Sequence, residues 1–162
     1  MAKSDIFLRL KSLKGGVIKG ESADAQHKDE MDIRSIAWGM KSTTAMGAKG
    51  PSNKTSFDSV KIVKDVDRAS TALMGVMRTN DAVVEAVVTV RKASGGAAPL
   101  DYMQVKIKDG RITAYDLQSD PAQPALLVET LSLTFKAIEI QYKAQDASGS
   151  GGGATTFNAE AI

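Results

Sequence analysis

Residues 19–40, KGESADAQHKDEMDIRSIAWGM, are the stretch that decides the fold of this chain. They begin with a glycine-containing turn, continue as a polar connector with the only histidine, His27, and end as a strand with the only tryptophan, Trp38. Apolar side chains alternate along the strand with a period of two, but the apolar set changes face between Ile33 and Ile36. Either a bulge or a strand that is apolar on both faces would explain this change. A two-sided strand needs two partners, such as the core of its own molecule and another subunit.

Composition excludes several classes of protein. A chain of 162 residues is most simply one domain with one core, and the absence of cysteine excludes disulfides and cysteine-ligated metals. The formal charge of +2 is too small to indicate binding to nucleic acid. The first residues do not form a signal peptide, and no apolar run approaches the roughly 20 residues of a membrane span. We therefore expect no membrane insertion, and export without a signal peptide if the chain leaves the cell.

Charge is distributed unevenly beside the central stretch. Residues 21–32 are acidic, and residues 41–64 are basic. The acidic side chains are those of Glu21, Asp24, Asp29, Glu30 and Asp32. Two solvated faces would account for this pattern. The alternative is that one segment meets the other across a self-association interface, where complementary charge sets register and association rate more than affinity.

Residues 41–55, KSTTAMGAKGPSNKT, are the second distinctive segment. Small and polar residues broken by Gly47, Gly50 and Pro51 predict a long loop. Loops of this length are uncommon in compact domains and are usually functional or disordered. Because apolar strands flank the segment, it could instead be an extended hairpin that protrudes.

The remaining segments predict one helix among many strands. A helix is expected over 67–78, where apolar residues recur with helical spacing. Strands with alternating apolar side chains are expected at 5–10, 56–64, 83–92, 101–108, 111–117 and 127–142. Asp109-Gly110 is typical of the turn of a tight hairpin. In the last strand the apolar set changes face after Ala137, which we interpret as a bend or as a passage from core to interface.

These segments predict a mainly β fold, namely a small closed β-barrel of two antiparallel sheets with one flanking α-helix and a long extended loop. Closure removes the unpaired sheet edges that invite aggregation. We place a single barrel domain at residues 1–143 and expect the Gly/Ser-rich residues 144–162 to form a flexible C-terminal tail.

The chain offers little that could catalyse a reaction. A Ser-His-Asp site would have to use His27, and the Gly-x-Ser-x-Gly turn of such enzymes is missing. His27 and the acidic residues around it could hold a metal, but these ligands are local, so a His–carboxylate hydrogen bond that fixes the loop is the better interpretation. The run before Lys54 lacks the glycine that a phosphate-binding loop requires. We therefore predict no enzyme, no cofactor and no metal.

The pattern GES, H-x-DE-x-D and WGM within residues 20–40 resembles the Hcp family, the hemolysin-coregulated proteins of the bacterial type VI secretion system. The matching residues are Gly20, Glu21, Ser22, His27, Asp29, Glu30, Asp32, Trp38 and Gly39. DIFLRL at 5–10, the helix start at 67–73 and VETLSLTFKAIEIQY at 128–142 are similar as well, so the resemblance covers roughly residues 4–143. Thr71 departs from the proline that the family often has, which affects only the rigidity of the helix.

The resemblance implies a structural function. Proteins of this family form six-membered rings that stack into a tube, which a contractile sheath drives out of the bacterium with effectors in its channel. The expected partners are other copies of this chain, the sheath and spike proteins, and secreted effectors. The expected location is the bacterial cytoplasm, followed by secretion to the exterior or a target cell. The alternative is a monomeric β-barrel that binds a small ligand, and native mass separates the two.

The candidate functional residues form three surfaces. We expect residues 41–55 to reach from one ring to the next and to meet the acidic segment defined above. This ring-stacking loop contains Lys41, Gly47, Lys49, Gly50, Pro51, Asn53 and Lys54. The candidates for the subunit interface or the core are Ile36, Trp38, Met40, Ile138, Ile140 and Tyr142.

Overall fold

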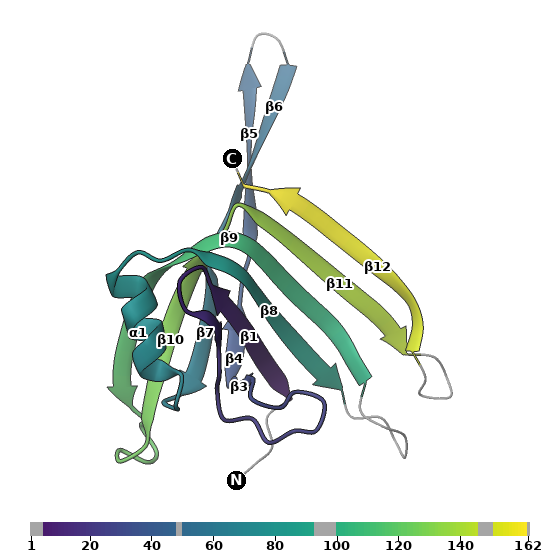
Figure 1. Cartoon of the computed structure of the whole chain (residues 1–162). Coiled ribbons are helices and arrows are strands. Elements are labelled where there is room, and N and C mark those ends of the chain that lie inside the picture. The colour runs from purple at the N-terminus through teal and green to yellow at the C-terminus, as the bar shows by residue number, and fades with distance from the viewer. Residues whose placement is uncertain (1–4, 48–49, 93–99, 146–150, 162) are drawn as a thin grey trace.

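The computed structural model describes residues 5–47, 50–92, 100–145 and 151–161 (Figure 1). Among these residues one helix, α1 (Ser70–Arg78), accompanies strands that make up most of the described backbone. The strands are β1 (Ile6–Ser12), β2 (Gly16–Ile18), β3 (Met31–Asp32), β4 (Ser35–Ala37), β5 (Met40–Gly47), β6 (Gly50–Phe57), β7 (Val60–Asp65), β8 (Val83–Lys92), β9 (Leu100–Ser119), β10 (Leu127–Thr134), β11 (Ala137–Gln145) and β12 (Gly151–Glu160). The prediction of a mainly β fold with one flanking helix is confirmed.

Strand β9 connects the two halves of a ten-stranded sheet. Its first half pairs with β8 and β11, and its second half pairs with β10, which in turn pairs with β7. The halves therefore lie at an angle and enclose the core between them (Figure 1). All of the strand pairs recorded in this sheet are antiparallel.

The sheet does not close, so the expectation of a small closed barrel is wrong. The path of paired strands has β2 at one edge and β4 at the other, and β12 forms a further edge beside β11. Within the described residues, no strand pairing joins these edges. Closure would require hydrogen bonds between the first and last strands. Here the bend in β9 and the packing of α1 cover the core instead, which buries apolar side chains without a continuous ring of strands (Figure 1).

The expected hairpin at Asp109-Gly110 is also wrong, because both residues lie inside the single strand β9. Asp109 has φ of 52°. A Cβ atom on Gly110 would lie 2.1 Å from the carbonyl oxygen of Thr134. The left-handed residue and the close approach of two backbones bend the strand at this point without reversing it. The same bend separates the residues that pair with β8 from those that pair with β10.

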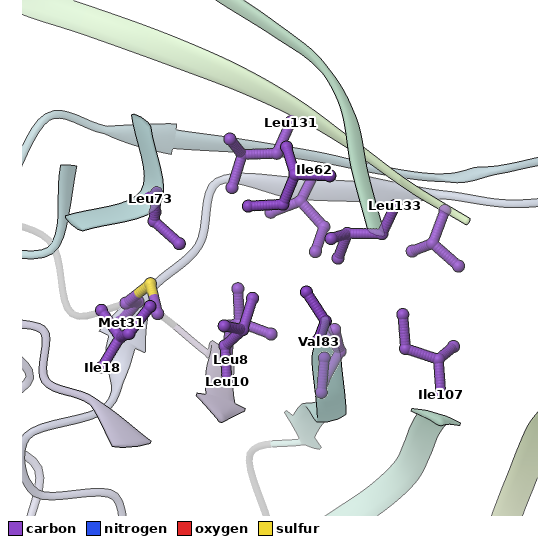
Figure 2. Close-up of a cluster of buried hydrophobic side chains, with 14 of the residues drawn as sticks. Leu8, Leu10, Ile18, Met31, Ile62, Leu73, Val83, Ile107, Leu131 and Leu133 are labelled. Atoms are coloured by element: carbon purple, nitrogen blue, oxygen red, sulfur yellow. The ribbon is translucent and has the colours of Figure 1, made fainter. Parts of the chain in front are cut away.

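The core lies between the two halves of the sheet (Figure 2). Leu8 and Leu10 of β1 face Leu131 and Leu133 of β10, and all four are fully buried. Helix α1 adds Leu73, one of the buried residues of its apolar stripe. The helix begins at Ser70, three residues after the expected start, because residues 67–69 form the turn that leads into it.

Strands form in two segments where the sequence predicted a loop or a flexible tail. Met40–Gly47 and Gly50–Phe57 form a two-stranded sheet, β5 and β6, so of the two possibilities the extended hairpin is confirmed. The flexible tail expected over 144–162 is wrong for Gly151–Glu160, which form β12 and pair with β11. In that pairing Phe157 lies opposite Ile140 and Ala159 opposite Ile138, so the apolar alternation after the glycines places this strand on the sheet. Residues 146–150 lie outside the described residues.

Candidate functional site

The β5–β6 hairpin projects beyond one end of the sheet (Figure 1). Aromatic side chains anchor its base, where the ring of Trp38 stacks on that of Phe57 with centroids 6.2 Å apart. The Phe57 ring also contacts Phe135, with centroids 6.3 Å apart. Lys41 near the base is exposed, and its Nζ atom is 4.0 Å from a carboxylate oxygen of Asp58, a surface contact of little energetic value. The hairpin is therefore held at its base, and beyond it the recorded strand pairing of β5 and β6 is with each other.

The glycine-containing turn and the polar connector, together residues 19–30, lie at the opposite end of the molecule from the outer ends of β5 and β6 (Figure 1, the dark purple loop at the bottom). The N–H of Ser22 donates to the carbonyl of Glu30, and the N–H of Asp29 donates to the carbonyl of Ser22, at 2.9 and 3.0 Å. A Cβ atom on Gly20 would lie 2.6 Å from the carbonyl oxygen of Glu30, so the close approach of the two chain segments requires glycine. These contacts give the Gly20-Glu21-Ser22 motif a structural role.

His27 fixes the connector to the sheet. Its Nδ1 atom is 2.8 Å from Oε2 of Glu30, and its Nε2 atom is 3.2 Å from Oδ1 of Asp101 on β9. The buried ring stacks on Phe7 of β1, with centroids 4.3 Å apart. Burial by itself lowers the pKa of His27, but the hydrogen bonds to the two carboxylates and their charges outweigh it and raise the pKa above its usual value. The expected His–carboxylate hydrogen bond is confirmed.

The contacts of His27 predict a pH-dependent stability. Because the pKa is raised in the folded state, the contribution of the imidazolium is fully present below the unfolded pKa of about 6.5 and is lost as pH rises through the folded value. The free energy of unfolding of the wild type should therefore fall relative to that of His27→Gln as pH rises from 6 to 9. Urea unfolding across this range measures the difference, and NMR of the single histidine gives its pKa. A difference that stays constant with pH would contradict the assignment.

Most acidic residues of the connector are already paired within the chain. Arg91 of β8 contacts Asp24, with Nη1 2.6 Å from the carboxylate, and this hydrogen bond lowers the pKa of Asp24. Arg68 approaches Asp29 to 3.6 Å, and its backbone N–H donates to the carboxylate of Glu21 at 3.2 Å. The acidic segment is thus less available to a partner than its sequence indicates.

Within the described residues, no group of three or more histidines and acidic residues is arranged to hold a metal ion. Helix α1, the one helix in the described part of the chain, has nine residues and is too short to cross a membrane.

The six apolar candidates for core or interface separate into three groups. Ile138 belongs to the core, with 2% of its surface exposed. Three residues are half-buried against the core, namely Ile36, Trp38 and Ile140. Met40 and Tyr142 are exposed, at 49% and 45%. Of this set, Met40 and Tyr142 offer the apolar surface that an interface would cover.

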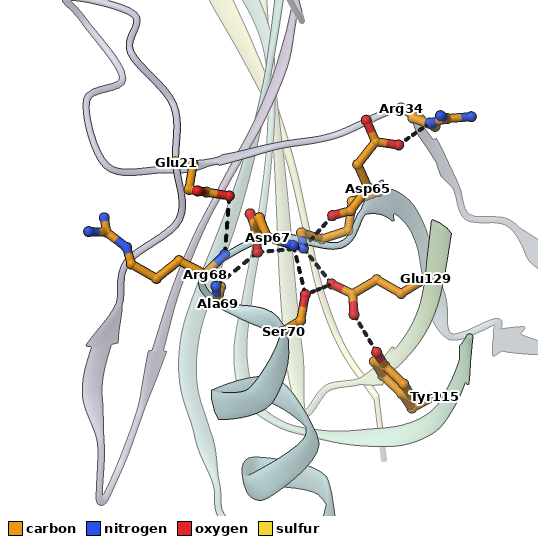
Figure 3. A network of polar contacts seen from close by, with 10 residues as sticks. Glu21, Arg34, Asp65, Asp67, Arg68, Ala69, Ser70, Tyr115 and Glu129 are labelled. Carbon is orange, nitrogen blue, oxygen red and sulfur yellow. Dashed lines mark hydrogen bonds and ion pairs between the residues drawn. The ribbon is translucent and has the colours of Figure 1, made fainter. Parts of the chain in front are cut away.

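A buried polar cluster was not expected from the sequence (Figure 3). The side chains of Lys64 on β7 and Glu129 on β10 are both fully buried and form an ion pair. Tyr115 donates to Oε2 of Glu129 at 2.5 Å, and Ser70 of α1 donates to Oε1 at 2.9 Å. Burial and then the bond to Glu129 raise the pKa of Tyr115. Strand alternation could have revealed the pair, because Lys64 shares a face with Ile62, and Glu129 shares one with Leu131.

Comparison with known families decides the identity of the chain. Residues 7–142 match the family model described as type VI secretion system effector, Hcp. The chain belongs to the Hcp family. The matched residues include the connector, the hairpin and most of β11, whereas β12 follows them. The resemblance noted from residues 20–40 is therefore confirmed, and the protein is an Hcp protein of the type VI secretion system.

Relatives of this Hcp extend the match over nearly the whole chain. The protein Hcp1 of Pseudomonas aeruginosa is 26% identical over 149 residues, which cover 90% of this chain and 86% of that protein. The crystal structure of Hcp1 from Salmonella typhimurium is similar with a TM-score of 0.74 and 25% identity, over 96% of this chain and 95% of that one. A type VI secretion system effector from Yersinia pestis shares the fold, with a TM-score of 0.72, 24% identity and coverage of 96% and 99%.

Proposed function

We propose that this Hcp is the subunit of the inner tube of a type VI secretion system, in which six copies form a ring and rings stack head to tail. The observation that carries the proposal is the position of the two distinctive segments at opposite ends of the molecule (Figure 1). A contact between unlike surfaces on two copies repeats without limit unless rotation closes it, so it suits a tube. The basic hairpin and the acidic connector are such unlike surfaces.

In this tube, the hairpin of one ring contacts the connector end of the next ring. The exposed residues Met40, at the base of the hairpin, and Tyr142, on β11, belong to contacts between copies. The half-buried Trp38 supports the hairpin from below through its stack on Phe57. Effectors travel in the channel of the ring, and the sheath and spike proteins of the machine are the other partners. The tube is assembled in the cytoplasm and leaves it through the secretion machine.

A monomeric ligand-binding barrel is the weaker alternative. Such a protein holds its ligand in an open interior, usually a cavity of several hundred Å³ lined by apolar side chains. The interior between the two halves of this sheet is occupied by Leu8, Leu10, Ile62, Leu131 and Leu133, each with no exposed surface (Figure 2). A ligand would have to displace this core.

Charge reversal in the hairpin tests the stacking contact. The double variant Lys49→Glu and Lys54→Glu should raise the concentration needed for tube formation at least about tenfold and spare single rings, because repulsion replaces attraction at the contact between rings. Sedimentation velocity and negative-stain microscopy separate rings from tubes. The matched control is Lys61→Glu with Lys136→Glu, which reverses two exposed lysines outside the hairpin, one on β7 and one in the bend between β10 and β11. Tubes that form as readily as in the wild type would contradict the role of the hairpin.

A further inference from the structure

Strand β12 is a long edge strand of the sheet. It has ten residues, and within the described part of the chain it pairs only with β11. The other edge strands of this sheet, β2, β3 and β4, have two or three residues each. Figure 1 shows β12 as the outermost strand on its side of the sheet. One row of its backbone groups therefore faces away from the molecule.

The pairing identifies the groups in that row. The N–H of Ala161 donates to the carbonyl of Lys136, and the register continues without a shift back to Ala154 opposite Lys143. Residues of an antiparallel strand alternate between bonding to the partner and pointing away from it. Odd-numbered residues from 155 to 161 therefore bond to β11. The outward N–H and C=O groups belong to Ala154, Thr156, Asn158 and Glu160.

The edge of β12 lacks the features that protect exposed edges. Protected edges carry lysine, proline or bulges, or they are very short. Between Ala154 and Glu160 the strand has no lysine or proline, its register is regular, and its only charge is Glu160. Phe157 adds an apolar side chain that is 39% exposed. Such an edge is a template for pairing with another strand.

The β5–β6 hairpin lacks a third strand, just as the outer edge of β12 lacks a partner strand among the described residues. Its two strands of eight residues form a separate sheet, and among the described residues they pair only with each other. An isolated two-stranded hairpin is marginally stable at best, so it gains from a third strand. The strands are about 26 Å long and would cover most of the roughly 33 Å of β12. The charged residues of the hairpin are all lysines, whereas β12 carries only Glu160.

We propose that the outer edge of β12 is a docking edge for the β5–β6 hairpin of a second copy of this Hcp, which extends the sheet across the two copies. The hairpin of the same copy does not fill this place, since it projects away from the sheet (Figure 1). Each copy then docks its hairpin on one neighbour and binds the hairpin of another, so the assembly can grow by repeating the same contact. This proposal rests on the proposed self-assembly and gives the hairpin a backbone contact with β12, in addition to its contact with the connector end of the next copy.

Cross-linking tests which surfaces meet, because the natural chain has no cysteine. Thr55→Cys on β6 combined with Thr156→Cys on β12 should give trimers and larger products with a short bismaleimide. Either single variant should give dimers at most, because its cysteine is present on only one of the two unlike surfaces. The matched control combines Thr55→Cys with Thr71→Cys on the exposed face of α1 and should give no ladder.

Proline substitution tests the backbone contact itself. Thr156→Pro and Asn158→Pro each remove an outward N–H and leave the bonds to β11 in place, because proline is tolerated on the open side of an edge strand. Each variant should lower the assembled fraction at least tenfold while its melting temperature stays near that of the wild type. Sedimentation velocity measures assembly, and circular dichroism measures melting.

The outcomes separate this proposal from the proposed function. A wild type that never assembles overturns both. A wild type that assembles, together with proline variants that assemble equally and no cross-linked ladder, overturns the β12 contact and leaves the tube function standing. If a proline variant unfolds β12, the cross-linking result decides, since it needs no proline.

Discussion

Lys64→Met should lower the free energy of unfolding by about 3–5 kcal/mol, the usual effect of removing one partner of a buried ion pair. The side chains of Lys64 and Glu129 have no exposed surface. Without the ammonium group, the carboxylate of Glu129 stays buried without a cation. Urea unfolding of the purified variant at neutral pH measures the change.

The contacts of Lys64 explain why the effect should be large. Its Nζ atom donates to the carbonyl of Asp65 and to the carboxylate of Asp67, both at 2.9 Å, in addition to Glu129 (Figure 3). The same oxygen of Asp67 accepts the N–H of Ala69, the residue before α1. One ammonium group thus connects β7, β10 and the start of the helix. Loss of Lys64 should therefore also loosen α1, which hydrogen exchange would detect.

Two variants control this experiment. Lys61→Met changes an exposed lysine on the same strand and should alter stability by no more than about 0.5 kcal/mol. Lys64→Met combined with Glu129→Leu removes both charges and should recover part of the loss, although the hydroxyl groups of Ser70 and Tyr115 then lack their acceptor. A double variant less stable than Lys64→Met alone would contradict the buried-charge explanation.

Gly110→Ala should destabilise the fold by about 3 kcal/mol, near the upper end for overpacking. The added Cβ atom would lie 2.1 Å from the carbonyl oxygen of Thr134 and 3.3 Å from its carbonyl carbon. Backbone atoms cannot rotate away as a side chain can, so β9 and the end of β10 must separate. Thermal and urea unfolding measure the loss.

The same substitution at Gly75 is the control for Gly110. No atom lies within 4 Å of a Cβ built there, and the residue is inside α1. Gly75→Ala should therefore stabilise the protein, by up to about 1 kcal/mol, because alanine is the better helix former. Equal effects at the two glycines would show that the bend in β9 is not closely packed.

Local sequence patterns predicted several elements, the buried faces of the strands and one contact of the connector. Alternation placed Leu8, Leu10 and Leu131 on buried faces, and helical spacing located α1. The single histidine was assigned a hydrogen bond to a carboxylate, and the structure places it between Glu30 and Asp101. These predictions succeeded because the period of two or 3.6 depends only on the local backbone.

Predictions that needed a distant partner failed. Asp109-Gly110 has the composition of a hairpin turn, yet the two halves of β9 continue in one strand because each has its own partners in β8 and β10. The glycines at the start of β12 indicated flexibility, but the pairing of Phe157 with Ile140 holds the strand on the sheet. The cation for Glu129 comes from a residue 65 positions away.

The sequence by itself determined the family, the mainly β character, the single helix and the two charged segments, since these depend on residue types and short spacings. Only the tertiary structure decided that hairpin and connector lie at opposite ends and that, across the described ranges, the sheet stays open and the outer edge of β12 has no strand partner. The pairing of strands depends on packing between segments that are far apart in the chain. The free energy of pairing therefore cannot be inferred from the sequence of one segment alone.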